Sequence, residues 1–326
     1  MKKYQITLSV LLALATVFTV ACGDSKTATT IPTFTKLSFL SNRTVDPATP
    51  LFVANLDGSS PAGILTNNGS WTYSPSTSAD LTVLAYTSDA DVWVTNTAGA
   101  TPLQLTNNAA SDFYTQFVKV SPDGTMLLYS LYNTANYHIL IMKADGTGST
   151  DLTSTPPTGM TDCYAASFSA DSTKIVFSCS GSTNAGVYTM NTDGTGTATV
   201  ITNTDFFDDP MFTSDGSKVL FVDYTGAEAS AHRRNLKSAP HATVRSHVAH
   251  GTTQTYGIDS VNLDGSSLTV LVPNAYEGVI LNSTLYYTIY DTDLDLDQIY
   301  KANVDGTGAV SISDGTSDDY LGLSND

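Results

Sequence analysis

The sequence predicts an all-β fold built from six similar units, each of four short antiparallel strands. A glycine turn, acidic in five of its six copies, returns along the 326 residues at spacings typical of a repeat architecture. The runs beside these turns are short and rich in Val, Ile, Thr, Tyr and Phe, the residues that favour strands. Charged residues make up only 14% of the chain, well below the usual figure of about 25%.

The chain is strongly acidic, with 14 Lys+Arg against 31 Asp+Glu and a formal net charge of -17. Because such a surface repels phosphate backbones, we expect no binding to nucleic acid. The apolar fraction of 41% also argues against an intrinsically disordered chain.

The N-terminus has the features of an export signal. Lys2 and Lys3 precede an apolar run at residues 6–20. This run is too short to span a membrane comfortably and is typical of a signal peptide.

The apolar run ends in Thr19-Val20-Ala21-Cys22, which resembles the lipobox of bacterial lipoproteins, although those usually have Leu where this chain has Thr19. The resemblance implies that residues 1–21 are removed and that Cys22 is lipidated. Residues 22–33 would then form a flexible tether. Ordinary secretory cleavage after the same apolar run is the alternative.

The repeat itself is a strand that ends in an acidic glycine turn. The six turn glycines are Gly58, Gly99, Gly146, Gly194, Gly265 and Gly306. They are separated by 41, 47, 48, 71 and 41 residues, and a period of about 40 to 50 is typical of propellers and solenoids. The overlong interval indicates an insertion at about residues 226–257 in the fifth unit.

A second turn precedes each strand pair, most clearly at residues 121–124 (Ser-Pro-Asp-Gly) and 213–216 (Thr-Ser-Asp-Gly). Asp-Gly between alternating apolar runs is a strong hairpin signal, because Gly accepts the positive φ that primed turns require. Each unit therefore contains two hairpins. The hairpin spacing alone permits a propeller or a β-solenoid.

The order of a Ser-Pro-Asp-Gly turn, two strands, an Asp-Gly turn and a Leu-Thr ending resembles the repeats of TolB-like β-propellers, of the WD-like or PD type. The resemblance covers about residues 34–326 and implies a six-bladed β-propeller of four-stranded antiparallel blades. Residues 34–39 match a second strand and residues 318–326 match a first strand, so the C-terminal strand is expected to complete the first blade. Closure of this kind removes unpaired sheet edges.

Two cysteines flank one predicted hairpin. If Phe168 pairs with Ile175, Cys163 and Cys179 lie nearly opposite each other on adjacent strands, at a separation that a disulfide can span. An oxidising compartment outside the cytoplasm favours the disulfide. Two reduced core thiols are the alternative, and neither arrangement is catalytic.

Several carboxylates fall just before innermost strands. They are Asp162, Asp208, Asp209, Asp318 and Asp319, with Tyr164, Phe206, Phe207 and Tyr320 beside them. A blade arrangement like that of the family brings these carboxylates toward one mouth of the central channel. Two interpretations stay open, a funnel for a basic peptide or a cation, and carboxylates that cap turns through local hydrogen bonds.

Two further segments are candidates for metal binding. Asp291, Asp293 and Asp295 alternate in one turn, a pattern that suits calcium, although an ordinary solvated acidic turn is the alternative. The insertion holds four of the five His and four basic residues. Its His247-Val248-Ala249-His250 run permits a metal site, and a mobile or partner-binding loop on an acidic face is the other interpretation.

The sequence contains no nucleophile elbow, phosphate loop or zinc-hydrolase motif, so we expect a protein that is not an enzyme and needs no cofactor. We expect a monomer, anchored by an N-terminal lipid in the bacterial cell envelope and facing the periplasm or the surface. Its predicted role is to bind an envelope protein or peptide. The alternative is a propeller that binds or modifies carbohydrate, with a divalent cation.

Overall fold

The computed structural model describes residues 31–41, 51–64, 72–96, 98, 100–108, 113–225, 256–317 and 319–321. The chain divides into the units Met1–Ile31 and Pro32–Asp326, and the fold described below is that of the second unit. Every regular element in the described residues is a β-strand.

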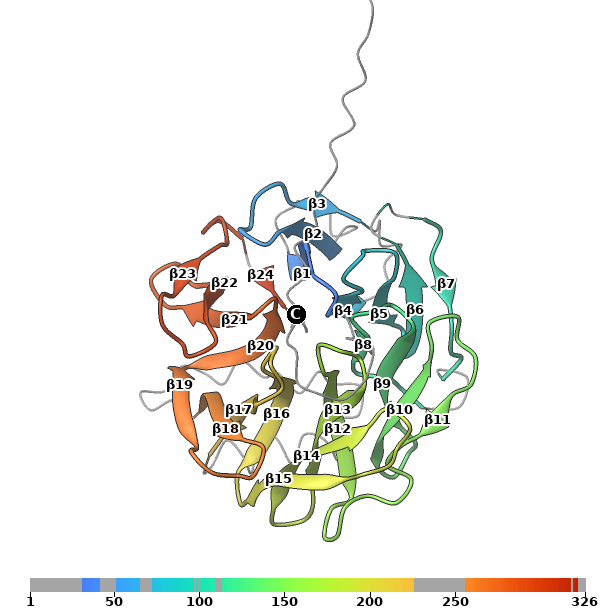
Figure 1. The fold of residues 1–326 in the computed structure, drawn as a ribbon. Coiled ribbons are helices and arrows are strands. Elements are labelled where there is room, and N and C mark those ends of the chain that lie inside the picture. The colour runs from blue at the N-terminus through green and yellow to red at the C-terminus, as the bar shows by residue number, and fades with distance from the viewer. Residues whose placement is uncertain are drawn as a thin grey trace, which may run out of the picture. The chain divides into compact units, whose positions relative to one another are not determined.

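Twenty-four strands form six four-stranded antiparallel sheets around a common centre (Figure 1). The innermost strands are β24 (Asp319–Tyr320), β4 (Thr72–Thr77), β8 (Val118–Val120), β12 (Asp162–Phe168), β16 (Phe206–Phe212) and β20 (Ala275–Leu281). The second strands are β1 (Lys36–Ser41), β5 (Leu84–Ser88), β9 (Met126–Tyr132), β13 (Lys174–Ser180), β17 (Lys218–Tyr224) and β21 (Thr284–Asp291). The third strands are β2 (Leu51–Asn55), β6 (Asp91–Thr95), β10 (Tyr137–Lys143), β14 (Ala185–Asn191), β18 (Tyr256–Asn262) and β22 (Leu296–Asn303). The outermost strands are β3 (Ala62–Gly63), β7 (Leu103–Gln104), β11 (Thr150–Asp151), β15 (Ala198–Asn203), β19 (Thr269–Pro273) and β23 (Val310–Ser311).

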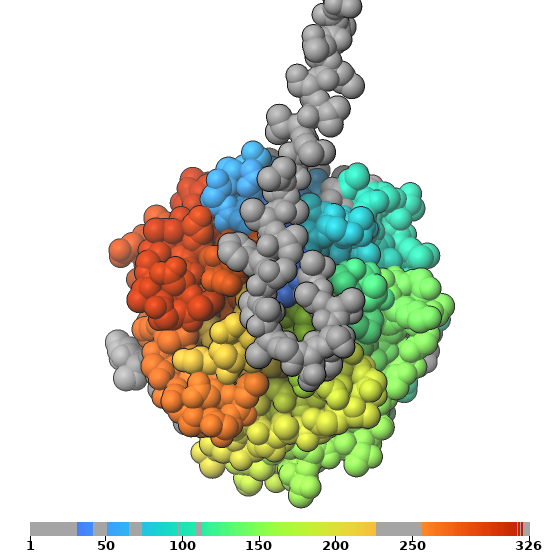
Figure 2. Space-filling model, viewed as in Figure 1, coloured from blue at the N-terminus to red at the C-terminus, as the bar shows by residue number. Residues whose placement is uncertain are grey.

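This arrangement confirms the predicted six-bladed β-propeller. We number the blades in chain order, so that blade 1 contains β1 to β3 together with β24, and blade 6 contains β20 to β23. Figure 2 shows the same order from outside, with the red C-terminal blade beside the blue first blade.

The C-terminal strand closes the ring as the sequence predicts. Leu40 and Ser41 of β1 pair antiparallel with Tyr320 and Asp319 of β24. Leu321 follows and is buried in an apolar cluster that joins blade 1 to blade 6. Blade 1 is therefore assembled from both ends of the domain.

A buried carboxylate strengthens this closure. Glu277 of β20 is 1% exposed, and its Oε2 accepts hydrogen bonds from the Thr288 hydroxyl and from the backbone N–H of Leu321, both at 2.8 Å. One side chain of blade 6 thus satisfies a backbone donor of the segment that completes blade 1. Glu277 is not among the predicted site residues.

The antiparallel order gives the propeller two different faces. The turns that join the first strand to the second and the third strand to the fourth of each blade lie on one face, which we call the turn face. The connections between blades and the loops between second and third strands lie on the other, the loop face. On the turn face, Gly58 of blade 1 has φ +82, and a Cβ there would meet the backbone oxygen of Ile312 at 2.3 Å, so this turn requires glycine.

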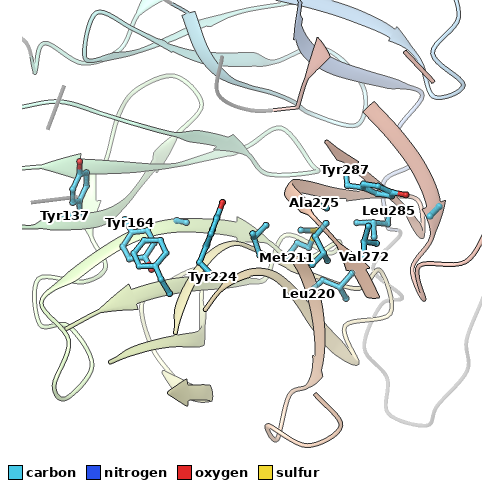
Figure 3. Packing of buried hydrophobic residues seen from close by; sticks show 14 of the residues in the cluster. Tyr137, Tyr164, Met211, Leu220, Tyr224, Val272, Ala275, Leu285 and Tyr287 are labelled. Atoms are coloured by element: carbon cyan, nitrogen blue, oxygen red, sulfur yellow. The ribbon is translucent and has the colours of Figure 1, made fainter. Parts of the chain in front are cut away.

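Apolar clusters fill the spaces between blades, because alternate residues of each strand point to opposite sides. In β13, Ile175 and Phe177 face blade 3, whereas Val176 faces Phe207 and Phe221 of blade 5. Another cluster continues from Tyr137 in blade 3 to Tyr287 in blade 6 (Figure 3).

Two inner strands carry the same bulge. In β4 the register shifts between Tyr73 and Ser76, and in β16 between Asp208 and Met211. Each bulge contains a residue of positive φ followed by proline, and each proline carbonyl accepts a hydrogen bond from the preceding blade. The bonds run from Ser38 to Pro75 at 3.4 Å and from Ser167 to Pro210 at 2.6 Å. A local break in one sheet therefore supplies an acceptor to its neighbour.

Candidate functional site

The five carboxylates predicted at the channel mouth do not form one uniform ring. Asp162 begins β12, Asp208 and Asp209 lie within β16, and Asp319 begins β24. Asp318 lies outside the described residues.

Asp162 and Asp319 are buried, each with 1% of its surface exposed. Asp162 accepts a hydrogen bond from the backbone N–H of Tyr137 in blade 3 at 3.2 Å and another from the Thr161 hydroxyl at 2.7 Å. Asp319 belongs to the ladder that closes the ring. The bond from Thr161 is local, whereas the bond from Tyr137 links blade 4 to blade 3. Because both carboxylates are buried, neither is open to a large partner.

Asp208 and Asp209 are only partly buried and lie at the bulge of β16. Asp208 accepts a hydrogen bond from the backbone N–H of Asp209 at 2.9 Å, and Asp209 has φ 42. A residue other than Gly in this backbone region is strained, and such positions concentrate at functional sites. With Asp205 in the connection before β16, these residues form an acidic sector on blade 5, defined here as Asp205, Asp208 and Asp209.

The neighbouring aromatic residues belong to the core. Tyr164 stacks on Phe206 with ring centroids 4.8 Å apart, and its hydroxyl donates to the backbone oxygen of Phe207 at 2.6 Å. Phe206 and Phe207 are fully buried. These rings join blade 4 to blade 5 and do not offer a stacking surface to a ligand. Tyr320 lies in β24.

A second acidic group on blade 5 is not among the predicted site residues. Asp223 of β17 and Asp259 of β18 are 7% and 6% exposed. Burial, with the nearby charges of Asp205 and Asp259, raises the pKa of Asp223 to about 7. Burial, followed by the charge of Asp205, raises the pKa of Asp259 to about 6. The sequence signal that could have indicated these two residues is the presence of a carboxylate within a mainly apolar strand.

Cys163 and Cys179 are joined by a disulfide in the structure, with Cα atoms 4.0 Å apart. Their register differs by one residue from that of Phe168 and Ile175, because a bulge at Tyr164 absorbs the difference. Both cysteines are fully buried, so this bond crosses two strands inside blade 4.

The alternating aspartates form the turn between β21 and β22. Asp291 accepts hydrogen bonds from the backbone N–H groups of Asp293 and Leu294 at 2.9 and 3.2 Å, and the Tyr290 hydroxyl donates to Asp295. Within the described residues, no three His, Cys, Asp or Glu side chains gather as a metal site. The carboxylates of Asp291 and Asp295 both accept hydrogen bonds from the protein itself. Calcium binding at this turn stays a prediction.

Other predicted features fall outside the described part of the chain. They include the signal peptide, Cys22, the tether up to residue 30 and the insertion with its histidines, of which residues 226–255 are not described. Among the described residues, no helix is long and apolar enough to cross a membrane.

Comparisons with known proteins agree with the fold. The family described as TolB beta propeller domain matches residues 27–253. No curated protein sequence matches the chain.

Three solved structures share the architecture. TolB from Acinetobacter baumannii is similar at a TM-score of 0.65 and 14% identity, over 88% of this chain and 65% of that one. The chain thus spans less than two thirds of that TolB. The nidogen/laminin complex contains a chain with a TM-score of 0.61 and 12% identity, over 84% of this chain and 91% of that one. Oligogalacturonate lyase in complex with manganese has a TM-score of 0.52 and 12% identity, over 86% of this chain and 74% of that one. At these identities the likeness concerns the fold alone.

Proposed function

Because this chain belongs to the TolB β-propeller domain family, we propose that it is a non-catalytic binding scaffold of the bacterial cell envelope, anchored by a lipid on Cys22. In this proposal the propeller is a monomer that presents its loop face to a protein or peptide. Family membership and the predicted signal peptide at residues 1–21, which ends just before Cys22, support the location. A fold alone does not define a function, so the argument for binding rests on the acidic sector of blade 5.

The acidic sector carries the proposal because its carboxylates are concentrated and partly open to solvent. Asp208 and Asp209 are adjacent, half-buried and held in a strained bulge of an innermost strand. The net charge of the chain is -17, so the field around this face attracts positive groups. We therefore propose a partner that presents a basic segment to the loop face of blade 5.

Neutralising the sector should weaken capture of this partner. We expect an Asp208→Asn/Asp209→Asn variant to recover at least about tenfold less of a cross-linked envelope protein than the unchanged chain. Each lost contact between close opposite charges should weaken binding by about 1.5 kcal/mol or more. The readout is quantitative mass spectrometry after capture from envelope extract. Recovery should also fall as salt rises.

Asp89→Asn is the control, because it removes one exposed charge from the loop between β5 and β6 of blade 2. Equal recovery of the envelope protein by the unchanged chain, the double variant and the control would contradict the role of the acidic sector. A glycan captured in place of a protein, particularly one that requires added calcium, would support the carbohydrate-binding alternative.

Lipidation is tested separately. In cells fed an alkyne-labelled fatty acid, we expect the chain to take up the label and to sediment with membranes, because acyl chains supply the apolar contact that anchors it. Cys22→Ala should abolish both. Labelling that survives this substitution, or a soluble unlabelled chain with intact Cys22, would contradict the anchor while leaving the binding proposal to its own test.

A further inference from the structure

Asp223 and Asp259 lie on one side of blade 5, facing blade 4. In β17, Val219 and Phe221 point into the cluster between these blades, and Asp223 continues the same alternation. In β18, Val261 points into that cluster and Asp259 shares its side. The two carboxyls therefore extend an apolar interface toward the loop face.

The strand register places the two acids close together. Asp223 is paired with Gly257, and Phe221 is paired with Asp259. The carboxyls are thus diagonal neighbours on one face of two adjacent strands, a separation of about 7–8 Å between backbone positions, over which side chains interact.

Blade 5 differs here from all other blades. In blade 5 the turn after the third strand opens at Asn262, and Asp259 lies three residues before it. The third strand of each other blade has an equivalent position. The occupants are Phe52, Trp93, Leu140, Tyr188 and Tyr300 in the other blades. Asp259 alone puts a carboxyl in a place otherwise taken by a large apolar side chain.

One carboxylate oxygen of Asp223 lacks a hydrogen-bond partner in the interface. Its Oδ1 is buried and makes no hydrogen bond. The facing strand β13 presents Ser178, whose hydroxyl is also buried and unpaired. Leaving this carboxylate charged is costly, because Oδ1 is shielded from water and accepts no hydrogen bond in exchange. A neutral, protonated carboxyl is the form that this interface accepts.

Among the described residues, the other ionisable groups around the pair add no positive charge. Asp205 raises the pKa of both acids, and the Tyr164 hydroxyl is bound to the backbone of Phe207. Asp208 lies on the opposite side of β16 from Phe207. Within the described residues of blades 4 and 5, the basic side chains are those of Lys174 and Lys218, which begin their strands at the turn face.

We propose that Asp223 and Asp259 form a proton-dependent latch between blades 4 and 5, closed while the pair holds a proton and weakened when both carboxyls are ionised. The latch acts in the direction opposite to an ordinary surface aspartate. Because the pKa values of both acids are raised in the folded state, the pair's full contribution to stability is present below the unfolded value of about 4. This contribution is lost as the pH rises through the folded-state pKa values of Asp259, about 6, and Asp223, about 7.

The test compares the unchanged chain with Asp223→Asn, Asp259→Asn and the control Asp89→Asn, an exposed aspartate between β5 and β6, at pH 5 and pH 8. We expect the unfolding equilibrium constant of the unchanged chain, measured in urea, to rise about 10- to 100-fold more between these pH values than that of Asp223→Asn. Asp259→Asn should show a similar loss of pH dependence, and Asp89→Asn none. The readout is the ratio of the unfolding equilibrium constants at pH 8 and pH 5. A variant that is less stable at both pH values therefore still tests the proposal.

Hydrogen exchange locates the effect. After correction for intrinsic rates, amides of β17 and β18 should lose more protection at pH 8 than those of β9 and β10, and Asp223→Asn should remove this difference. A variant that keeps the full pH dependence of the unchanged chain overturns the latch. Loss of protection spread evenly over all blades also overturns it.

Discussion

A chain that lacks residues 318–326 should melt at least about 10 °C lower than the intact chain, because the ring can no longer close. The deletion removes both ladder pairs between β24 and β1, the burial of Leu321 and the donor to Glu277. Together these contacts represent several kcal/mol, a large share of the about 5–15 kcal/mol that stabilises a typical domain. Differential scanning calorimetry measures the change.

A point substitution separates closure from simple truncation. Glu277→Gln keeps the shape and one acceptor oxygen, whereas Glu277→Ala leaves the Thr288 hydroxyl and the Leu321 N–H without their partner. We expect the alanine variant to lose about 1–3 kcal/mol of unfolding free energy for each orphaned buried group and the glutamine variant to lose less. Unchanged melting of both the truncated chain and Glu277→Ala would refute closure as a source of stability.

Replacing both Cys163 and Cys179 with Ala should lower the free energy of unfolding by about 3 kcal/mol. The bond closes a loop of sequence separation 16, and removing it returns conformational freedom to the unfolded chain. Alanine suits the site because the apolar cluster around the two cysteines leaves no partner for a polar replacement. Urea unfolding of oxidised protein provides the measurement.

Reductant supplies the matched control for the disulfide. Because the bond is fully buried, dithiothreitol should leave the folded protein oxidised and act only once blade 4 opens. With reductant present during unfolding, the unchanged chain should approach the stability of the double variant. Equal stability of the two proteins under oxidising conditions would show that the cross-link does not contribute.

The repeat pattern was sufficient to predict the blades, because hairpin turns are local and the alternation of apolar residues fixes which side is buried. The cysteine pair shows the limit of that reasoning. A uniform register places Cys163 and Cys179 nearly opposite, and the bulge at Tyr164 removes the remaining offset. The bulged Tyr164 donates a hydrogen bond to the backbone oxygen of Phe207 in the next blade, a contact that local sequence patterns do not contain.

The candidate site was harder to predict for the same reason. Asp162 resembles a carboxylate at the channel mouth in sequence, but its partner is the backbone of Tyr137 in another blade. Asp223 and Asp259 look like solvent-facing positions of alternating strands until blade 4 covers them. Both blade faces are covered in a propeller, so a polar residue in a strand does not mark a side open to water.

The outer edges of the blades are unequal. β3, β7, β11 and β23 have two residues each, too short to recruit a foreign strand, whereas β15 and β19 have six and five. Val270 in β19 is 62% exposed, and Leu268 just before it is 47% exposed. An unpaired edge of that length with apolar side chains is a template for strand addition. The rim of blade 5 is therefore where aggregation between copies would begin during export or refolding, and charged substitutions there are the natural means of preventing it.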